Sequence, residues 1–231
     1  NSKKLIYHLS ITGTHLSAKH GHTFKEILKD KIPVNSRLNI LNYDDSDLGV
    51  SKSFSKGVIK FSKLFQKIKP NIIIILGDRF EILSAAIAAT LNKIPIAHIH
   101  GGEETVGAID NVIRHSITKL SHIHFTSTND YKKRVIQMGE NPKYVFNVGA
   151  LGLEDIKNFN FKTKKYFKNK YNINFNRKTI LVCFHPVTLE PKMEIIYIKK
   201  ILSSLKNFEN INIIFTSPNV DQGYKNIDDK I

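Results

Sequence analysis

The chain has 231 residues with 41% hydrophobic content, enough for a packed core, and a formal net charge of +15. Its lysines are spread along the chain and no nucleic-acid-binding signature is present, so the charge indicates a solvated surface rather than a nucleic-acid partner. No apolar run approaches the roughly 18 residues that span a membrane, and the single cysteine, Cys183, excludes an internal disulfide. These features predict a globular cytoplasmic protein without a membrane partner.

Apolar segments of two periodicities alternate along the chain. Residues 71–76 form a short, continuous, β-branched run, as in a strand buried on both faces, whereas 81–91 has apolar residues at helical spacing. Such alternation is typical of a doubly wound parallel sheet. In chain order we predict strand 5–12, helix 53–68, strand 71–76, helix 81–91, strand 94–100, helix 108–120, strand 122–126, helix 130–138, strand 144–148, strand 179–184, helix 195–205, strand 211–216 and a loop over 218–223.

A basic stretch without glycine, residues 159–176, separates the first group of predicted strands from the second. We therefore predict a first α/β domain at 1–158, a boundary at 159–176 and a second α/β domain that starts at 177 and runs to 231. The second group has only two strands, too few for a stable sheet packed on both faces. The chain also opens a few residues before a strand, so we expect a fragment of a longer protein.

Ionisable residues follow the strands predicted at 71–76 and 94–100. Asp78 and Arg79 lie in GDR after the first strand, and His100 and Glu103 lie at the end of the second. Ligands of open parallel sheets collect at the carboxyl ends of the strands. A carboxylate beside a guanidinium suits an anionic ligand whose neighbouring C–H or O–H is deprotonated. Asp78 is equally suited to capping the helix that follows it.

The segment GGEETVGAIDNVIRHS adds two more carboxyl groups, Glu104 and Asp110, and places Arg114 and His115 at helical distances from Asp110. Asp110 and Arg114 are also spaced for an ordinary surface ion pair, worth a few tenths of a kcal/mol. Several carboxyl groups at one sheet edge push their pKa values apart, which supplies one base and one acid. These mutual pKa shifts of neighbouring carboxyl groups favour a catalytic site over a surface ion pair.

Two further strand ends carry polar residues. His185, in CFHPVT, follows strand 179–184, and its place at the carboxyl end of a strand, facing a cleft between the two segments, favours a functional role. Asn219 and Asp221 follow strand 211–216, where residues of these types are also ordinary turn formers.

Metal and cofactor signatures are weak throughout. Two histidine pairs, His98 with His100 and His122 with His124, each point the same way on a predicted strand, but no carboxylate pattern completes either as a metal site. Neither GxGxxG nor GxxxxGK[ST] occurs, so no cofactor is expected. The histidines assigned to packing or to the surface are His8, His20, His22, His98, His122 and His124.

Four runs, GDRFEILSAAIAA, HIHGGEETVGAIDNVIRHSITKLSH, FHPVT and SPNVDQG, resemble the hydrolysing UDP-N-acetylglucosamine 2-epimerases, which make N-acetylmannosamine for sialic acid synthesis. The similarity runs from ITGTHLS, at 11–17, to the end of the chain. It implies two Rossmann-like domains in a glycosyltransferase-B-like arrangement with UDP in the cleft. It also implies that an N-terminal strand and a C-terminal phosphate loop are missing, so 177–231 is only the start of the nucleotide-binding domain.

The resemblance also implies roles for individual residues. Asp78 and Asp110 match proposed acid/base groups, and His185 matches a histidine near the leaving phosphate. Some relatives have glutamate where this chain has His100, so the third acid/base role falls to His100 or to Glu103. Substrate or UDP contacts are implied for Arg79, Asn219, Asp221, Arg114 and His15.

The implied reaction removes the proton from the second carbon of the sugar, eliminates UDP to a glycal, and adds water with protonation from the opposite face. It needs no redox cofactor or metal, and the resemblance suggests a homodimer. One alternative substrate is a UDP-2,4-diacetamido-6-deoxy sugar, as in legionaminic acid pathways. A different class stays open too, because the same fold hosts glycosyltransferases and could host a module that only binds a sugar nucleotide.

Overall fold

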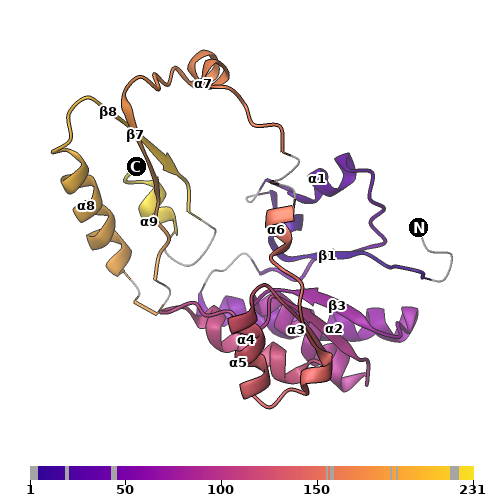
Figure 1. Ribbon diagram of the computed structural model, residues 1–231. Coiled ribbons are helices and arrows are strands. Elements are labelled where there is room, and N and C mark those ends of the chain that lie inside the picture. The colour runs from indigo at the N-terminus through magenta and orange to yellow at the C-terminus, as the bar shows by residue number, and fades with distance from the viewer. Residues whose placement is uncertain are drawn as a thin grey trace. The chain divides into compact units, whose positions relative to one another are not determined.

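The structure, a computed structural model, describes residues 5–18, 21–42, 46–154, 156, 159–187, 189–190, 192–218 and 224–231 (Figure 1). The chain divides into two compact units. The first contains residues 1–105 and 110–151, and the second contains 106–109 and 152–231. In the described residues no helix is long and apolar enough to cross a membrane.

A four-stranded parallel sheet forms the centre of the first unit. Its order is β3 (Ile73–Leu76), β4 (Ile96–Ile99), β5 (Ile123–Thr126) and β6 (Val145–Asn147). Helices α3 (Phe80–Leu91), α4 (Ile109–Leu120) and α5 (Asn129–Gln137) connect successive strands. All four strands and all three helices are predicted from the sequence, and the parallel α/β class is confirmed.

The core of this unit lies where α2 (Asp47–Ile68) and α3 pack against one another beside β3 (Figure 1). Phe61 and Phe65 of α2 are buried there against the alanines of α3, each burial worth about 1.5–3 kcal/mol. The helices approach so closely that a Cβ added at Gly57 would clash with Oγ of Ser84. Close packing on small residues fixes α3, whose first turn follows the GDR segment.

Helix α2 begins six residues before the predicted start at residue 53. Oγ of Ser46 accepts a hydrogen bond of 3.1 Å from the backbone N–H of Gly49, which satisfies one free donor of the first turn. The apolar periodicity starts only later, so it does not show this beginning.

The strand predicted at 5–12 is much shorter in the structure. Only β1 (Ser10–Thr12) is a strand, and it pairs in parallel with β2 (Ser36–Leu38), which the sequence did not predict. The three residues of β2 limit the ladder, and Leu5, Ile6 and Tyr7 are exposed. The described residues of the first unit also form helix α1 (Phe24–Lys29) and the 3₁₀ turns η1 (Gly13–Leu16) and η3 (Pro142–Tyr144).

The second unit has one parallel pair of strands, β7 (Lys178–Cys183) and β8 (Ile211–Thr216), as predicted. Helix α8 (Met193–Leu205) connects them and lies along the pair (Figure 1). The described residues from Leu151 onward also form three shorter helices: α6 (Leu151–Glu154), whose first residue belongs to the first unit, α7 (Lys164–Tyr171) and α9 (Tyr224–Asp228). Helix α7 lies within the predicted boundary 159–176 and is capped by Thr163, whose Oγ1 accepts from the N–H of Tyr166 at 3.3 Å.

Candidate active site at the carboxyl edge of the first sheet

The register of the first sheet brings Asp78 and His100 to the same edge. Leu76 of β3 is paired with Ile99 of β4, and the N–H of Gly77 donates to the carbonyl of Ile99 at 3.2 Å. Both strands stop at a residue with left-handed backbone, Gly77 at φ 93° and His100 at φ 67°. A non-glycine residue in that conformation is uncommon and is found preferentially at functional sites.

Asp78 forms an ion pair with an arginine of helix α4. Nη2 of Arg114, on α4, donates to Oδ2 of Asp78 in an ion pair, and it also donates to Oγ1 of Thr105 at 3.0 Å. Arg114 is only 4% exposed. The N-cap of α3 is Arg79, without a side-chain cap bond, so the structure gives no support to the capping role considered for Asp78.

Arg114 therefore lies within the protein rather than on its surface. Its Nη2 pairs with Asp78, whereas its Nη1 is buried and has no hydrogen-bond partner among the described residues. Asp110, in the first turn of the same helix, is half-buried. The sequence spacing also allows an exposed ion pair between Arg114 and Asp110. Burial of Arg114 shows instead that its guanidinium is part of the interior next to Asp78.

His98, assigned to packing from the sequence, contacts the backbone next to Asp78. Its Nε2 donates to the carbonyl oxygen of Gly77 at 2.8 Å. Burial, helped by the neighbouring His124 and then by the charge of Arg114, outweighs this hydrogen bond and lowers the pKa of His98 from 6.5 to about 4. A neutral imidazole with Nε2 as the donor thus fixes the turn that carries Asp78. The signal in the sequence that could have shown this contact is a histidine, His98, on the strand that pairs with the one ending at Gly77 and Asp78.

His100 forms a hydrogen-bonded chain with two other side chains. Its Nδ1 lies 2.6 Å from Oε1 of Glu103, and Oγ of Ser127, directly after β5, donates to the same oxygen at 2.6 Å. Burial alone would raise the pKa of the Glu103 carboxyl, but the bonds from Ser127 and His100, with the charge of Arg114, lower it. His98 and His100 thus have different partners and do not form the same-facing pair expected from a continuous strand.

Arg134 of α5 anchors the loop between β4 and α4. Nη1 of Arg134 donates to the carbonyl of Gly102 at 2.5 Å, and its Nη2 donates to Oε2 of Glu104 at 3.0 Å. Gly102 has φ 80°, and a Cβ there would lie 2.5 Å from the carbonyl oxygen of Tyr131. The loop that holds Glu103 is therefore packed closely enough to hold its geometry before a ligand arrives.

The other predicted residues of the first unit lie near the start of α3 or in η1. Nε of Arg79 is 3.5 Å from Oε2 of the buried Glu81. Glu81 also packs on the 11–17 turn, because a Cβ added at Gly13 would lie 2.8 Å from its Oε1. His15 is exposed in η1, with Nδ1 2.7 Å from Oγ1 of Thr23.

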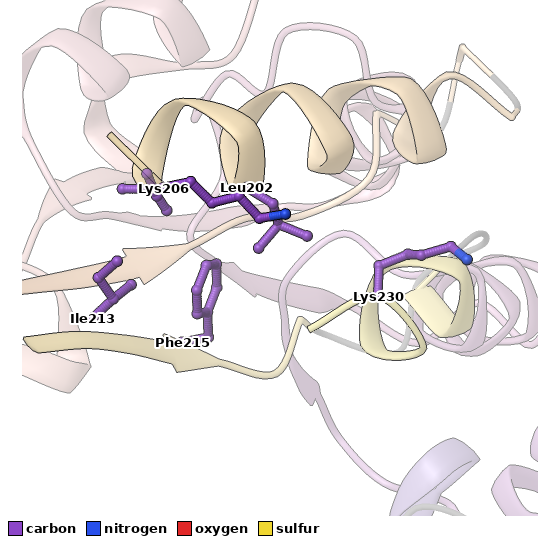
Figure 2. Close-up of a pocket in the computed structure, with 6 residues that line it drawn as sticks. Leu202, Lys206, Ile213, Phe215 and Lys230 are labelled. Carbon is purple, nitrogen blue, oxygen red and sulfur yellow. The ribbon is translucent and has the colours of Figure 1, made fainter. Parts of the chain in front are cut away.

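In the second unit His185 follows β7 and is exposed, with Nε2 3.2 Å from Sγ of Cys183. Asn219, Asp221, His20 and most of the predicted loop 218–223 lie outside the described residues. An open apolar hollow of about 330 Å³ lies between α8, β8 and the residues after α9 (Figure 2), and no predicted site residue lines it. No group of three or more His, Cys, Asp or Glu in the described part of the chain could hold a metal ion.

Ionisable side chains gather at the carboxyl ends of β3 and β4, the edge of an open parallel α/β sheet at which ligands of this class of fold bind. Residues 1–231 match the family described as UDP-N-acetylglucosamine 2-epimerase. The chain belongs to this family.

Two curated relatives and one solved structure illustrate the similarity. The chain is 42% identical over 222 residues to a GDP/UDP-N,N'-diacetylbacillosamine 2-epimerase (hydrolyzing) of Campylobacter jejuni, covering 96% of this chain and 58% of the relative. It is 38% identical to polysialic acid biosynthesis protein P7 of Escherichia coli, covering 96% and 57%. A UDP-GlcNAc 2-epimerase from Neisseria meningitidis bound to UDP-GlcNAc superimposes with a TM-score of 0.79 at 20% identity, covering 99% of this chain and 62% of that one.

The structural likeness confirms the predicted fold class, two Rossmann-like α/β domains of the glycosyltransferase-B type. The chain spans a little under six tenths of the length of the two curated relatives.

Proposed function

We propose that the protein containing this chain is a hydrolysing UDP-sugar 2-epimerase. The observation that carries the proposal is the arrangement at the sheet edge, where Asp78 is paired with buried Arg114 beside the His100–Glu103 pair. Two acid/base systems on neighbouring strands suit a reaction that removes a proton from one face of a carbon and returns one to the other. Family membership supports this assignment.

In the proposed reaction a base removes the hydrogen at the second carbon of the sugar. The C–H electron pair forms the double bond of a glycal while the bond from the first carbon to the UDP oxygen breaks. Water then adds to the first carbon and loses a proton, and an acid protonates the second carbon on the opposite face. Asp78 and Asp110 are proposed as the proton-transfer groups of the two faces, and the third acid/base role is proposed for His100 or Glu103.

UDP leaves as an anion, so cations and hydrogen-bond donors near its phosphates stabilise the transition state. We assign this role to His185 and Asn219 in the second unit and to Arg79 and His15 in the first. For Asp221 we propose a contact with the substrate or UDP away from the phosphates, because a carboxylate only accepts hydrogen bonds. For Arg114 we propose a contribution of its buried charge, which lies next to Asp78. No cofactor takes part in these steps. A homodimer is proposed from the family resemblance alone.

The sugar we favour is a 2,4-diacetamido-6-deoxy sugar rather than N-acetylglucosamine. The support is the 42% identity to a relative whose name gives diacetylbacillosamine, against 38% to one named for polysialic acid biosynthesis. UDP-N-acetylglucosamine, with N-acetylmannosamine as product, is the second candidate.

The test uses the full-length protein with three nucleotide sugars: UDP-diacetylbacillosamine, its GDP counterpart and UDP-N-acetylglucosamine. Nucleotide release is followed by chromatography and the free sugar is identified by NMR. We expect release of the 2-epimer of the diacetamido sugar without any acceptor. Release that requires an acceptor would indicate a transferase, and tight binding without release would indicate a binding module; either result refutes the epimerase.

A further inference from the structure

We propose that His100, Glu103 and Ser127 form one proton-transfer unit, in which His100 accepts a proton at Nε2 while Glu103 and Ser127 only position the ring. This inference rests on the proposed function and divides the labour between two residues that sequence analysis leaves as alternatives. It also adds Ser127, which no sequence pattern singles out.

The hydrogen-bond pattern determines which ring nitrogen is available. A carboxylate is an acceptor only, so the contact of 2.6 Å between Nδ1 of His100 and Oε1 of Glu103 requires a proton on Nδ1. The neutral ring then carries its lone pair on Nε2, which makes no hydrogen bond to any described residue. Nε2 is the atom that can take a proton from a ligand, as in other histidine–carboxylate pairs.

Glu103 is suited to orienting the ring and poorly suited to transferring the proton itself. The same oxygen that faces His100 also accepts from Ser127 at 2.6 Å, so it is occupied from two sides. The hydrogen bonds to it and the charge of Arg114 lower its pKa despite burial, which keeps it ionised and weakly basic. An ionised carboxylate also stabilises the imidazolium that forms when Nε2 takes a proton.

The charged groups around the unit come from three directions. Arg114 of α4 lies close enough to influence Glu103, and Asp78, on the turn after β3, is held by that arginine. Glu104, the next residue in the loop, is turned away from this chain of bonds because it pairs with Arg134 of α5. Glu104 is therefore a matched control for Glu103: same residue type, same loop, different partner.

The left-handed backbone of His100 and the anchored loop hold this arrangement without a ligand. His100 has φ 67°, and Arg134 fixes the carbonyl of Gly102 between His100 and Glu103. The three residues of the unit come from the ends of the neighbouring strands β4 and β5 and from the loop after β4, so the sheet register sets their distances.

The experiment reads the tautomer of His100 by ¹⁵N NMR in the full-length protein without substrate, with the signal assigned from a His100→Gln variant. We expect the Nδ1–H tautomer in the wild type. Glu103→Ala should shift the ring toward Nε2–H, whereas Glu104→Ala should leave it unchanged. Glu103→Gln should keep Nδ1–H, since the amide oxygen still accepts, but lose the negative charge.

Turnover gives the second readout. Losses of about 10–100-fold in kcat with little change in KM are expected for Glu103→Gln, and smaller ones of the same kind for Ser127→Ala, since supporting partners of this sort typically contribute that much. The exposed Ser116 of α4 provides the control, with Ser116→Ala at wild-type rate. An Nε2–H tautomer in the wild type, or wild-type kcat in Glu103→Gln, would overturn the proposal. A wild-type protein that releases no nucleotide refutes the proposed function instead. Because the tautomer of His100 is read without substrate, it tests the proton-transfer unit independently of that result.

Discussion

Arg114 and Asp78 form an ion pair across 36 positions of sequence, and their burial is unequal: the arginine side chain is 5% exposed and that of the aspartate 27%. Burying a guanidinium is costly unless it is paired, so Asp78 compensates a charge that water does not reach. The same carboxylate is the residue proposed for proton transfer. The ion pair gives Asp78 a structural role beside the proposed chemical one, so we expect its substitution to affect both.

Asp78→Asn is expected to lower turnover by about 10²–10⁴ because an amide accepts no proton. It should also lower the free energy of unfolding by about 1–3 kcal/mol, since the amide oxygen pairs weakly with the buried guanidinium. Steady-state assay of nucleotide release and urea denaturation measure the two effects. Near-normal turnover would return Asp78 to a purely structural role.

The fold of the first unit is readable from the sequence because its strands and helices have different apolar periods. The run at 71–76 and the alanine-rich pattern at 81–91 both match elements in the structure, β3 and α3. The short pair β1 and β2 is different. Its three-residue ladder depends on contacts between distant segments, such as Oγ1 of Thr12 donating to the carbonyl of Leu38 at 2.7 Å, and local propensity does not show these.

The candidate site can be predicted only in part from the sequence, again because contacts between distant segments are not shown by local patterns. Strand order places Asp78 and His100 at one edge, so their proximity follows from the βαβ pattern. The partners do not follow: Arg114 is 36 residues from Asp78, and Ser127 is 24 residues from Glu103. Sequence spacing favours the i,i+4 pairing of Asp110 with Arg114, whereas burial of the arginine against Asp78 is decided by packing.

His98 gives the fold a dependence on pH. Its folded pKa of about 4 is below its ordinary value of 6.5, so between these values the unfolded chain binds a proton that the folded chain excludes. The free energy of unfolding is therefore unaffected by this group above pH 6.5 and falls as the pH drops from 6.5 to 4, by up to about 3 kcal/mol. Burial lowers the pKa of His124 too, with the same sign.

His98→Gln should flatten this slope, because it removes the titrating group while an amide can still donate to the carbonyl of Gly77. Urea denaturation at pH 7 and at pH 4.5 measures it for both proteins. An identical slope in wild type and variant would show that His98 does not contribute.

Gly102→Ala is expected to destabilise the loop that holds Glu103, because the added Cβ would lie 2.5 Å from a backbone oxygen that cannot move aside. Gly149→Ala is the matched control. Gly149 has φ 81°, against 80° for Gly102, but nothing lies within 4 Å of its added Cβ. We expect the first variant to lose more stability and turnover than the second; equal losses would mean that φ alone requires glycine.

His185→Ala should weaken UDP binding and lower the rate while the fold is kept, since an exposed side chain away from the core rarely contributes more than about 0.5 kcal/mol. The thermal midpoint and the calorimetric affinity for UDP are compared with those of the wild type. Unchanged affinity together with unchanged turnover would leave His185 as a surface residue.

The central claim, elimination and hydration through acid/base residues of the sheet edge, is tested most directly by running the reaction in deuterated water. Proton removal at the second carbon followed by return of a solvent-exchanged proton predicts deuterium at that carbon in the released sugar, read by proton NMR and mass spectrometry. An internal hydride return would instead preserve the original hydrogen. Full deuterium incorporation is the result we predict, and product that retains its original hydrogen would contradict the account.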